Sequence, residues 1–174
     1  MRLFVRLSLI GLVALVAVGF AINQWRSDGD DKVQLPAMVL SGQCLDSGVS
    51  LVIDFGDATG SIEKCVKNYS GNSWDLFAAA SLKVEGTEKY PVGFICRIQS
   101  IPSKEQEACK DTPGALNGSW AFFIASADTG WQYSASGASS HKAKCGSAEG
   151  WRFLAKDEPI SNSPRVKPKT NVCN

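Results

Sequence analysis

The pattern of apolar and polar residues begins with an apolar leader. An uncharged run covers residues 7–25, and at 1.5 Å per residue it would reach about 28 Å as a helix, close to the thickness of a membrane's hydrocarbon core. Arg2 and Arg6 precede the run and acidic residues follow from Asp28. Because positive charge stays on the cytoplasmic side, we expect everything after the leader to lie outside the cytoplasm.

The leader has two interpretations, which the sequence leaves open. Residues 1–25 are either a signal anchor, which holds the chain in the cell membrane through an N-terminal transmembrane helix, or a signal peptide cleaved near Ala21, which gives a secreted protein. A polar spacer is then expected over residues 26–43 and one extracytoplasmic α+β domain over residues 44–154. A tail rich in Lys and Pro covers residues 155–174.

Alternation of apolar and polar residues predicts short strands in this domain. In residues 50–55, Leu51 and Ile53 fall on one face of a strand, and Asp54 falls on the other face, which we expect to point outward. Turn-forming residues separate the other expected strands, which cover residues 62–66, 94–98, 120–125, 131–136 and 151–154. Parallel βαβ winding is not predicted.

One amphipathic helix is predicted after the leader, capped by Ser73. Trp74, Phe77 and Leu82 recur at helical spacing, and Asp75 lies in the first turn, where it complements the helix dipole. A single helix among five or six strands indicates a small, mainly-β α+β domain in which the helix covers one face of a sheet.

Six cysteines follow the leader, and an even number in an exported chain predicts three disulfides. Several pairings are possible, and we expect neighbours in the sequence to pair, which would tie the tail to the domain. No two cysteines have the close spacing of structural zinc ligands and the chain has one histidine, so no metal site is expected. The expected pairs are Cys44 with Cys65, Cys96 with Cys109, and Cys145 with Cys173.

The charges and motifs argue against several function classes. Lys and Arg number 18 against 17 Asp and Glu, and they are scattered, so no nucleic-acid partner is expected. The sequence has no glycine-rich phosphate loop, no G-x-S-x-G and no C-x-x-C. His141 lies in a polar loop and is interpreted as a solvated side chain. We therefore expect a protein that is not an enzyme and has no cofactor.

The aromatic strands offer the candidate ligand-binding residues. Trp131 and Tyr133 share one strand face, and the opposite face of that strand is polar, so these rings could stack on a small flat ligand. The alternative is that they are only a packing pair, as we expect for Trp120 and Trp151 in the core.

Four segments carry a resemblance to a known family. They are LVIDFGD at residues 51–57, GFICR at 93–97 with Cys109, GSWAFF at 118–123 with GWQYSAS at 130–136, and EGWRF at 149–153. In this order they resemble exported actinobacterial proteins with a transcobalamin-like C-terminal domain. The resemblance implies a β-grasp-like fold and a ligand-handling or accessory role at the cell envelope, linked to micronutrient uptake. The chain departs from that family in its aromatic run at 119–123 and in its cysteine-tipped tail.

Together these features predict a membrane-tethered or secreted cell-envelope protein that is not an enzyme. It would bind a small flat ligand or an envelope protein partner. The alternative is an accessory structural subunit of a membrane protein complex, held there by its N-terminal helix.

Overall fold

A computed structural model describes residues 35–112, 118–127 and 129–173 of the chain. The predicted leader over residues 1–25 lies outside the described residues. Within the described ranges, no helix has the length and apolar character needed to cross a membrane.

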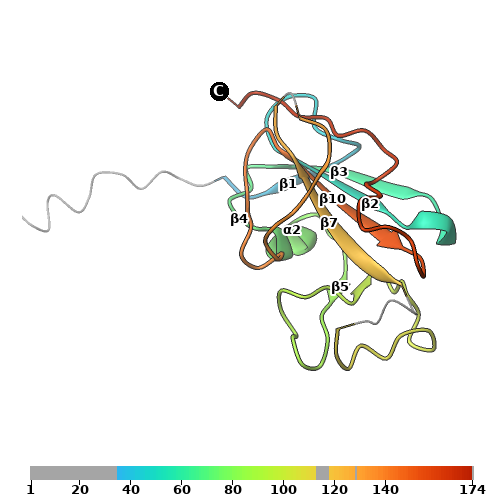
Figure 1. The fold of residues 1–174 in the computed structure, drawn as a ribbon. Helices are drawn as coiled ribbons and strands as arrows, with labels where there is room; N and C mark the ends of the chain where they lie inside the picture. The colour runs from blue at the N-terminus through green and yellow to red at the C-terminus, as the bar shows by residue number, and fades with distance from the viewer. Residues whose placement is uncertain (1–34, 113–117, 128, 174) are drawn as a thin grey trace, which may run out of the picture. The chain divides into compact units, whose positions relative to one another are not determined.

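Six strands form the main sheet, in the order β1-β3-β2-β10-β7-β8 (Figure 1). Neighbouring strands are antiparallel except β2 and β10, which run parallel at the centre of the sheet. The strand predictions at residues 50–55, 62–66, 120–125 and 151–154 are confirmed, with ends that differ by at most three residues. The strands are Met38–Ser41 (β1), Val49–Asp54 (β2), Ser61–Lys67 (β3), Ser119–Ala125 (β7), Gln132–Tyr133 (β8) and Ala148–Leu154 (β10).

Two small two-stranded sheets and a helix complete the described fold. Gly71–Asn72 (β4) pairs with Lys142–Ala143 (β9), and Val84–Glu85 (β5) pairs with Arg97–Ile98 (β6). The helix α2 covers Ser73–Ala79, and Gly56–Ala58 is a short 3-10 helix (η1). The described part of the chain is thus mainly β with a single α-helix, as the sequence predicts.

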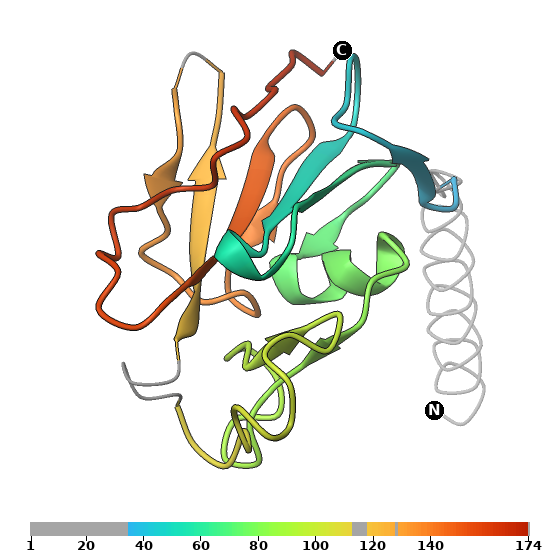
Figure 2. The same cartoon turned by 90° about the vertical axis from the view of Figure 1, so that its right-hand side faces the viewer.

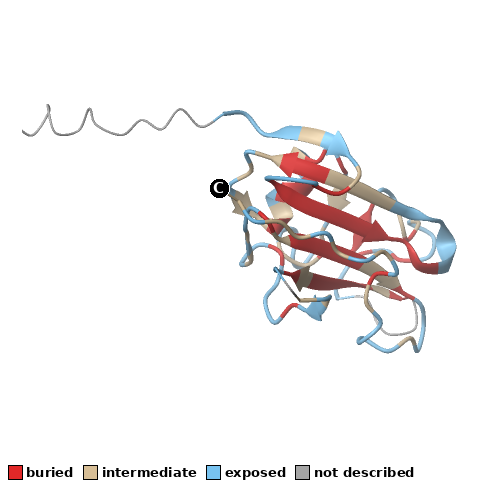
Figure 3. Ribbon diagram, turned by 90° about the horizontal axis from the view of Figure 1, so that it is seen from above, coloured by how far each residue is buried: buried red, intermediate tan, exposed pale blue. Residues whose placement is uncertain are grey.

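The first strand lies inside the predicted spacer over residues 26–43. Strand β1 is antiparallel to β3, with Val39 opposite Val66, so the folded unit begins before Cys44. Figure 3 shows that this strand lies at an exposed edge, whereas the central strands are buried. Because it buries neither face completely, its sequence carries no clear strand signal. Met38 and Leu40 are both exposed.

The helix starts one residue earlier than a Ser73 cap would place it. Asn72 is the cap, because its side-chain oxygen accepts a hydrogen bond of 2.8 Å from Asp75 N. Ser73 is instead the first helical residue and is fully buried. Leu76 and Phe77 point into the core, so the predicted apolar stripe does cover one face of the sheet.

The last strand shows how the sheet separates two faces. Trp151 of β10 packs against Phe77 of α2, with 5.5 Å between ring centroids. Gly150 and Arg152, its neighbours in the strand, face the other way: Gly150 lies against Trp131 and Pro164, and Arg152 bonds Asp54. The sheet therefore needs a second cover opposite the helix.

That cover is the C-terminal segment at residues 155–173, which we call the strap. Figure 2 shows the strap, in red, running along the sheet. The Arg165 side chain donates to both carboxylate oxygens of Asp54, and Asn171 donates to Cys44 O at 2.9 Å. The prediction that Asp54 points outward to solvent is wrong, because the strap buries that face and leaves Asp54 1% exposed.

Three disulfides brace the domain, and they are the three pairs expected from nearest neighbours in the sequence. Cys44 pairs with Cys65, Cys96 with Cys109, and Cys145 with Cys173. The last pair ties the end of the strap to the loop before β10. Since such bonds persist in oxidising compartments, they indicate a domain outside the cytoplasm.

Two predicted strands are shorter in the structure. Of residues 94–98, only Arg97–Ile98 are in a strand, which pairs with β5 rather than with the main sheet. Residues 95–98 are all buried, so both sides of this segment are covered. The alternation of apolar and polar residues in it therefore does not mark one buried and one exposed face of a strand. Of residues 131–136, only Gln132–Tyr133 pair with β7.

Candidate functional site

A hollow of about 300 Å³ opens between two loops on the helix side of the sheet. Residues 93–95 form one wall and residues 134–138 form the other. Three buried aromatic residues form the floor. Tyr133 borders the hollow where the second wall begins, and its ring packs against Phe123 on the other side of β7. We call this site the aromatic hollow. Its floor residues are Trp120, Phe122 and Trp151.

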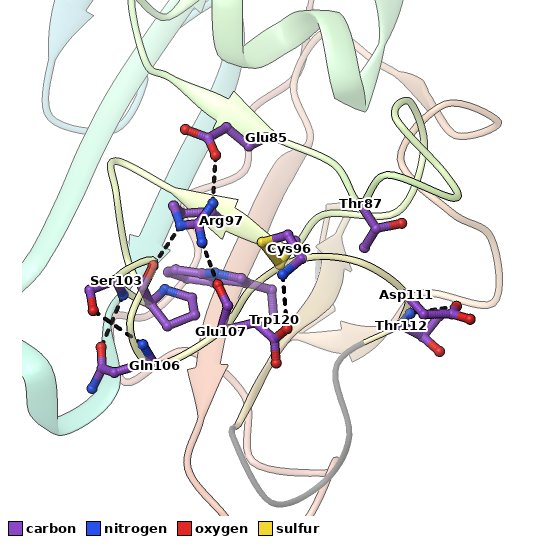
Figure 4. The surroundings of a disulfide bond; sticks show 12 residues. Glu85, Thr87, Cys96, Arg97, Ser103, Gln106, Glu107, Asp111, Thr112 and Trp120 are labelled. Atoms are coloured by element: carbon purple, nitrogen blue, oxygen red, sulfur yellow. Dashed lines mark hydrogen bonds and ion pairs between the residues drawn. A yellow bond between two sulfur atoms is a disulfide. The ribbon is translucent and has the colours of Figure 1, made fainter.

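The first wall is fixed by the buried side chain of Arg97, two residues beyond its end. Arg97 donates to the Glu85 carboxylate at 2.6 Å, to Pro102 O at 2.7 Å and to Glu107 O at 2.6 Å. Figure 4 shows these three bonds around one guanidinium group. An Arg side chain with bonded nitrogens on three sides holds its loop in one conformation.

A disulfide and a tryptophan add to this anchor. Cys96, the residue after the wall, is bonded to Cys109. Trp120 of the floor donates its indole N–H to Ile101 O at 3.1 Å, which ties the loop after β6 to β7. The wall at residues 93–95 is therefore built on a rigid base although it has no regular secondary structure.

The second wall is hydrogen-bonded to both β7 and α2. Ser134 N donates to Phe122 O at 2.8 Å, and Ala138 O accepts from Trp74 N at 3.1 Å. The walls approach each other at Gly93, which has a φ of +100° and where a Cβ atom would lie 2.6 Å from the Ser139 hydroxyl. Only glycine suits this position.

The floor is a packed group of rings. Phe122 stacks on Trp151 with 4.4 Å between centroids and 8° between planes. Trp120 meets Phe55 and Phe153 edge to face, at 5.5 and 5.3 Å. Such contacts hold each ring in one orientation, so the floor of the hollow is rigid.

Behind the floor lies a buried polar cluster of three residues. Ser73 donates to the Glu149 carboxyl at 2.9 Å, and His141 Nε2 lies 3.8 Å from the same oxygen. Phe122 connects the cluster with the hollow, since its ring also packs against His141 at 5.5 Å. His141 is thus partly enclosed by the core, and its interpretation as a solvated loop side chain is wrong.

Burial controls the charges in this cluster. It raises the pKa of Glu149 to about 8, against a smaller lowering by the Ser73 hydrogen bond. Burial, together with the charge of Lys144, lowers the pKa of His141. The two side chains are within ion-pair distance, but both shifts favour the neutral forms. Their contact at neutral pH therefore joins two uncharged groups.

The cluster contains the residue types of a nucleophilic site without its geometry. A serine nucleophile donates its proton to a base and is open to substrate. Ser73 is fully buried, and its hydroxyl donates to Glu149. Among the described residues no group of His, Cys, Asp and Glu side chains is placed to hold a metal ion.

The structure keeps the two rings that the sequence singled out on the strap side of the sheet. Tyr133 borders the aromatic hollow, but it is opposite Phe123 in the sheet and its ring packs edge to face against Phe123 at 5.7 Å, on the face that carries Trp131. Trp131 is not in the lining. The Trp131 ring lies under the strap, where its indole N–H donates to Val166 O at 2.7 Å and its six-membered ring lies against Gly150. Trp131 therefore packs the strap against the sheet.

Sequence reasoning missed that the buried rings line a hollow. Trp120 and Trp151 are in the core as expected, with 9% and 4% of their surfaces exposed, and they also form the floor of the hollow. The wall at residues 93–95 faces them from a distant part of the chain. Nothing in the local pattern around either tryptophan signals this wall.

Comparisons with protein families, with curated proteins and with solved structures found no match to this chain.

Proposed function

We propose that this chain is an extracytoplasmic envelope protein, not an enzyme, whose domain binds a small flat ligand in the aromatic hollow. The observation that carries the proposal is the hollow itself, with a rigid floor of three rings between two anchored walls. Ligand sites are typically concave, mostly apolar and preformed in this way. The leader supports a location at or outside the cell membrane.

The size of the hollow limits the ligand. A volume of about 300 Å³ is at the lower end of the range for small-molecule sites, and it suits one or two fused rings. A corrin or a haem would extend far beyond the walls. A role in micronutrient uptake, which the resemblance to transcobalamin-like domains suggests, would thus concern a smaller ring compound.

Titration with indole, followed by amide NMR of the full chain in detergent, tests this function. We expect saturable shifts at residues 93–95 and 134–138. Phe94→Ala should weaken binding several-fold, because it removes an aromatic side chain from the first wall. Tyr90→Ala is the control, since Tyr90 is an exposed aromatic residue outside the lining. Shifts spread over the surface, or equal effects of both variants, would contradict the proposal.

The accessory-subunit function is a second candidate, supported by the apolar surface around β1. Leu35, Met38, Leu40 and Leu45 are between 43% and 82% exposed, and β1 is an edge strand with one unpaired side. Both features suit contact with a partner protein. Purification of the full chain in mild detergent tests this function: a stoichiometric membrane partner that is lost in Leu40→Lys supports it.

A further inference from the structure

The disulfide at the end of the strap is more accessible to solvent than the other two. Cys145 is exposed and Cys173 is partly exposed, whereas the four cysteines of the other bridges are between 1% and 6% exposed. A disulfide is cleaved by a thiolate, which must reach one of the two sulfurs. Cys145–Cys173 is therefore the bridge of the folded domain that an external thiol can attack directly.

The turn before β10 supplies a hydrogen bond to one sulfur of this bridge. Gly48 N donates to Cys145 Sγ at 3.3 Å, and Gly146 N donates to Gly48 O at 2.7 Å, which holds the two loops together. An N–H group stabilises a thiolate more than it stabilises a neutral sulfur, and the more stable thiolate is the better leaving group. Cleavage of the bridge should therefore release Cys145 as the thiolate.

Other contacts would keep the two sulfurs close after cleavage. Asn171, two residues before Cys173, donates its N–H to the carbonyl of Gly146, the residue after Cys145, at 2.8 Å. Its side chain donates to Cys44 O at 2.9 Å. A single thiol attached to Cys173 would thus be displaced again by the nearby Cys145 thiolate. Net reduction requires a dithiol, whose second thiol completes the exchange.

We propose that Cys145–Cys173 is a thiol–disulfide exchange site, at which a dithiol reductant outside the cytoplasm releases the end of the strap. One thiolate of the reductant attacks Cys173 Sγ, the Cys145–Cys173 bond breaks, and Cys145 leaves as the thiolate. The second thiol of the reductant then attacks the mixed disulfide and frees Cys173. The reductant becomes a disulfide, and its two electrons and two protons end on the two cysteines.

Reduction would leave the end of the strap held by hydrogen bonds alone. Those bonds join Trp131 Nε1 to Val166 O at 2.7 Å and Gln43 to the backbone of Lys167 and Lys169 at 3.0 and 2.6 Å. The strap covers the face of the sheet opposite the helix, so the exchange turns a fixed cover into a removable one. The aromatic hollow opens on the helix side, and this inference does not rest on ligand binding there.

Timed reduction of the full chain in detergent tests the proposal. Dithiothreitol is the dithiol and glutathione the single thiol, and alkylation by iodoacetamide with peptide mass spectrometry identifies each freed cysteine. We expect dithiothreitol to reduce Cys145–Cys173 at least about tenfold faster than the other bridges, because a buried bridge reacts only after local opening. In urea the three rates should converge. With iodoacetamide present during the reaction, glutathione should be found on Cys173 and the alkyl group on Cys145.

Amide hydrogen exchange then measures release of the strap. Reduction of Cys145–Cys173 should speed exchange at residues 166–173 and leave β2 and β10 unchanged as internal controls. The double variant Cys145→Ser with Cys173→Ser should show the same exchange without reductant.

Each result has a definite meaning. Equal rates for the three bridges of the folded chain, or a slower rate for Cys145–Cys173, overturn the exchange site. Glutathione on Cys145 overturns the assigned leaving group, and unchanged hydrogen exchange at residues 166–173 overturns release of the strap.

Discussion

Arg165 in the strap forms a two-point ion pair with Asp54 at the end of β2, 111 positions away in the sequence, with N–O distances of 2.6 and 3.0 Å. Burial opposes ionisation of Asp54. Hydrogen bonds from the Arg165 side chain and backbone and from Gly56 N outweigh this effect, so the pKa of Asp54 lies below its ordinary value. The pair fastens the strap to the face of the sheet opposite the helix.

Loss of the Asp54 charge should therefore destabilise the domain. We expect Asp54→Asn to lower the free energy of unfolding by about 3 kcal/mol, as when one partner of a buried ion pair is removed. Urea denaturation at pH 7 measures this change. Asp57→Asn is the control, because Asp57 is 99% exposed and 3.8 Å from Arg165, and it should change stability by less than about 0.5 kcal/mol. Equal losses in the two variants would refute the role of the pair.

The buried Glu149 predicts that the stability of the domain falls as pH rises. Its pKa is raised from 4.5 to about 8, so between these values the unfolded chain has lost a proton that the folded chain keeps. The free energy of unfolding should therefore fall as pH rises from 4.5 to about 8 and then level off.

Glu149→Gln tests this pH dependence, because an amide mimics the protonated carboxyl and can still accept from Ser73. The variant should match the wild type near pH 5 and be more stable at pH 8.5 by something on the order of 3 to 5 kcal/mol. Denaturation at the two pH values measures it, with Glu88→Gln on the surface as control. A wild-type stability that is flat over this range would show that Glu149 ionises freely.

The disulfide at the end of the strap predicts a further stability effect. Cys145 and Cys173 are 28 residues apart, and opening a loop of this length costs about 3 to 4 kcal/mol in the chain-entropy account. The double variant Cys145→Ser with Cys173→Ser should lose this amount in urea denaturation, and limited proteolysis should then cut the strap first. Unchanged protease resistance would mean that the side-chain contacts alone hold the strap.

The tryptophans should differ in their contribution to stability. Trp120→Ala removes a ring that packs against two other rings in the core and should cost about 3 to 5 kcal/mol. Trp131→Ala should cost about half as much, because that ring is only partly buried. Thermal melts of the two variants compare them. A larger loss of stability in Trp131→Ala than in Trp120→Ala would contradict this, because packing under the strap would then contribute more to stability than packing on the helix side of the sheet.

Much of the fold follows from local pattern. The alternation around Leu51 and Trp120 predicts two of the central strands, and the spacing of Trp74 and Phe77 predicts the helix. These signals are local because each element buries one face against its neighbours. The even number of cysteines, with pairing between neighbours in the sequence, predicted the three disulfides that the structure contains.

The errors come from contacts between distant segments. Asp54 is on the face of its strand opposite Leu51 and Ile53, which the sequence pattern predicts to be exposed. The strap covers that face, and Arg165 of the strap bonds the Asp54 carboxylate. The parallel pairing of β2 with β10 joins residues about a hundred positions apart, such as Ile53 and Trp151, and neither strand carries a signal for it. The hollow was missed for the same reason, since its floor and its walls come from separate parts of the chain.

The central claim is that a flat ring lies on the floor of the aromatic hollow. The most direct measurement is a set of intermolecular nuclear Overhauser effects between the protons of bound indole and assigned side chains of the full chain. The account predicts contacts with the rings of Trp120, Phe122 and Trp151 and with the Gly93 α-protons. Contacts confined to Trp131 or to the exposed side chains of β1 would contradict it.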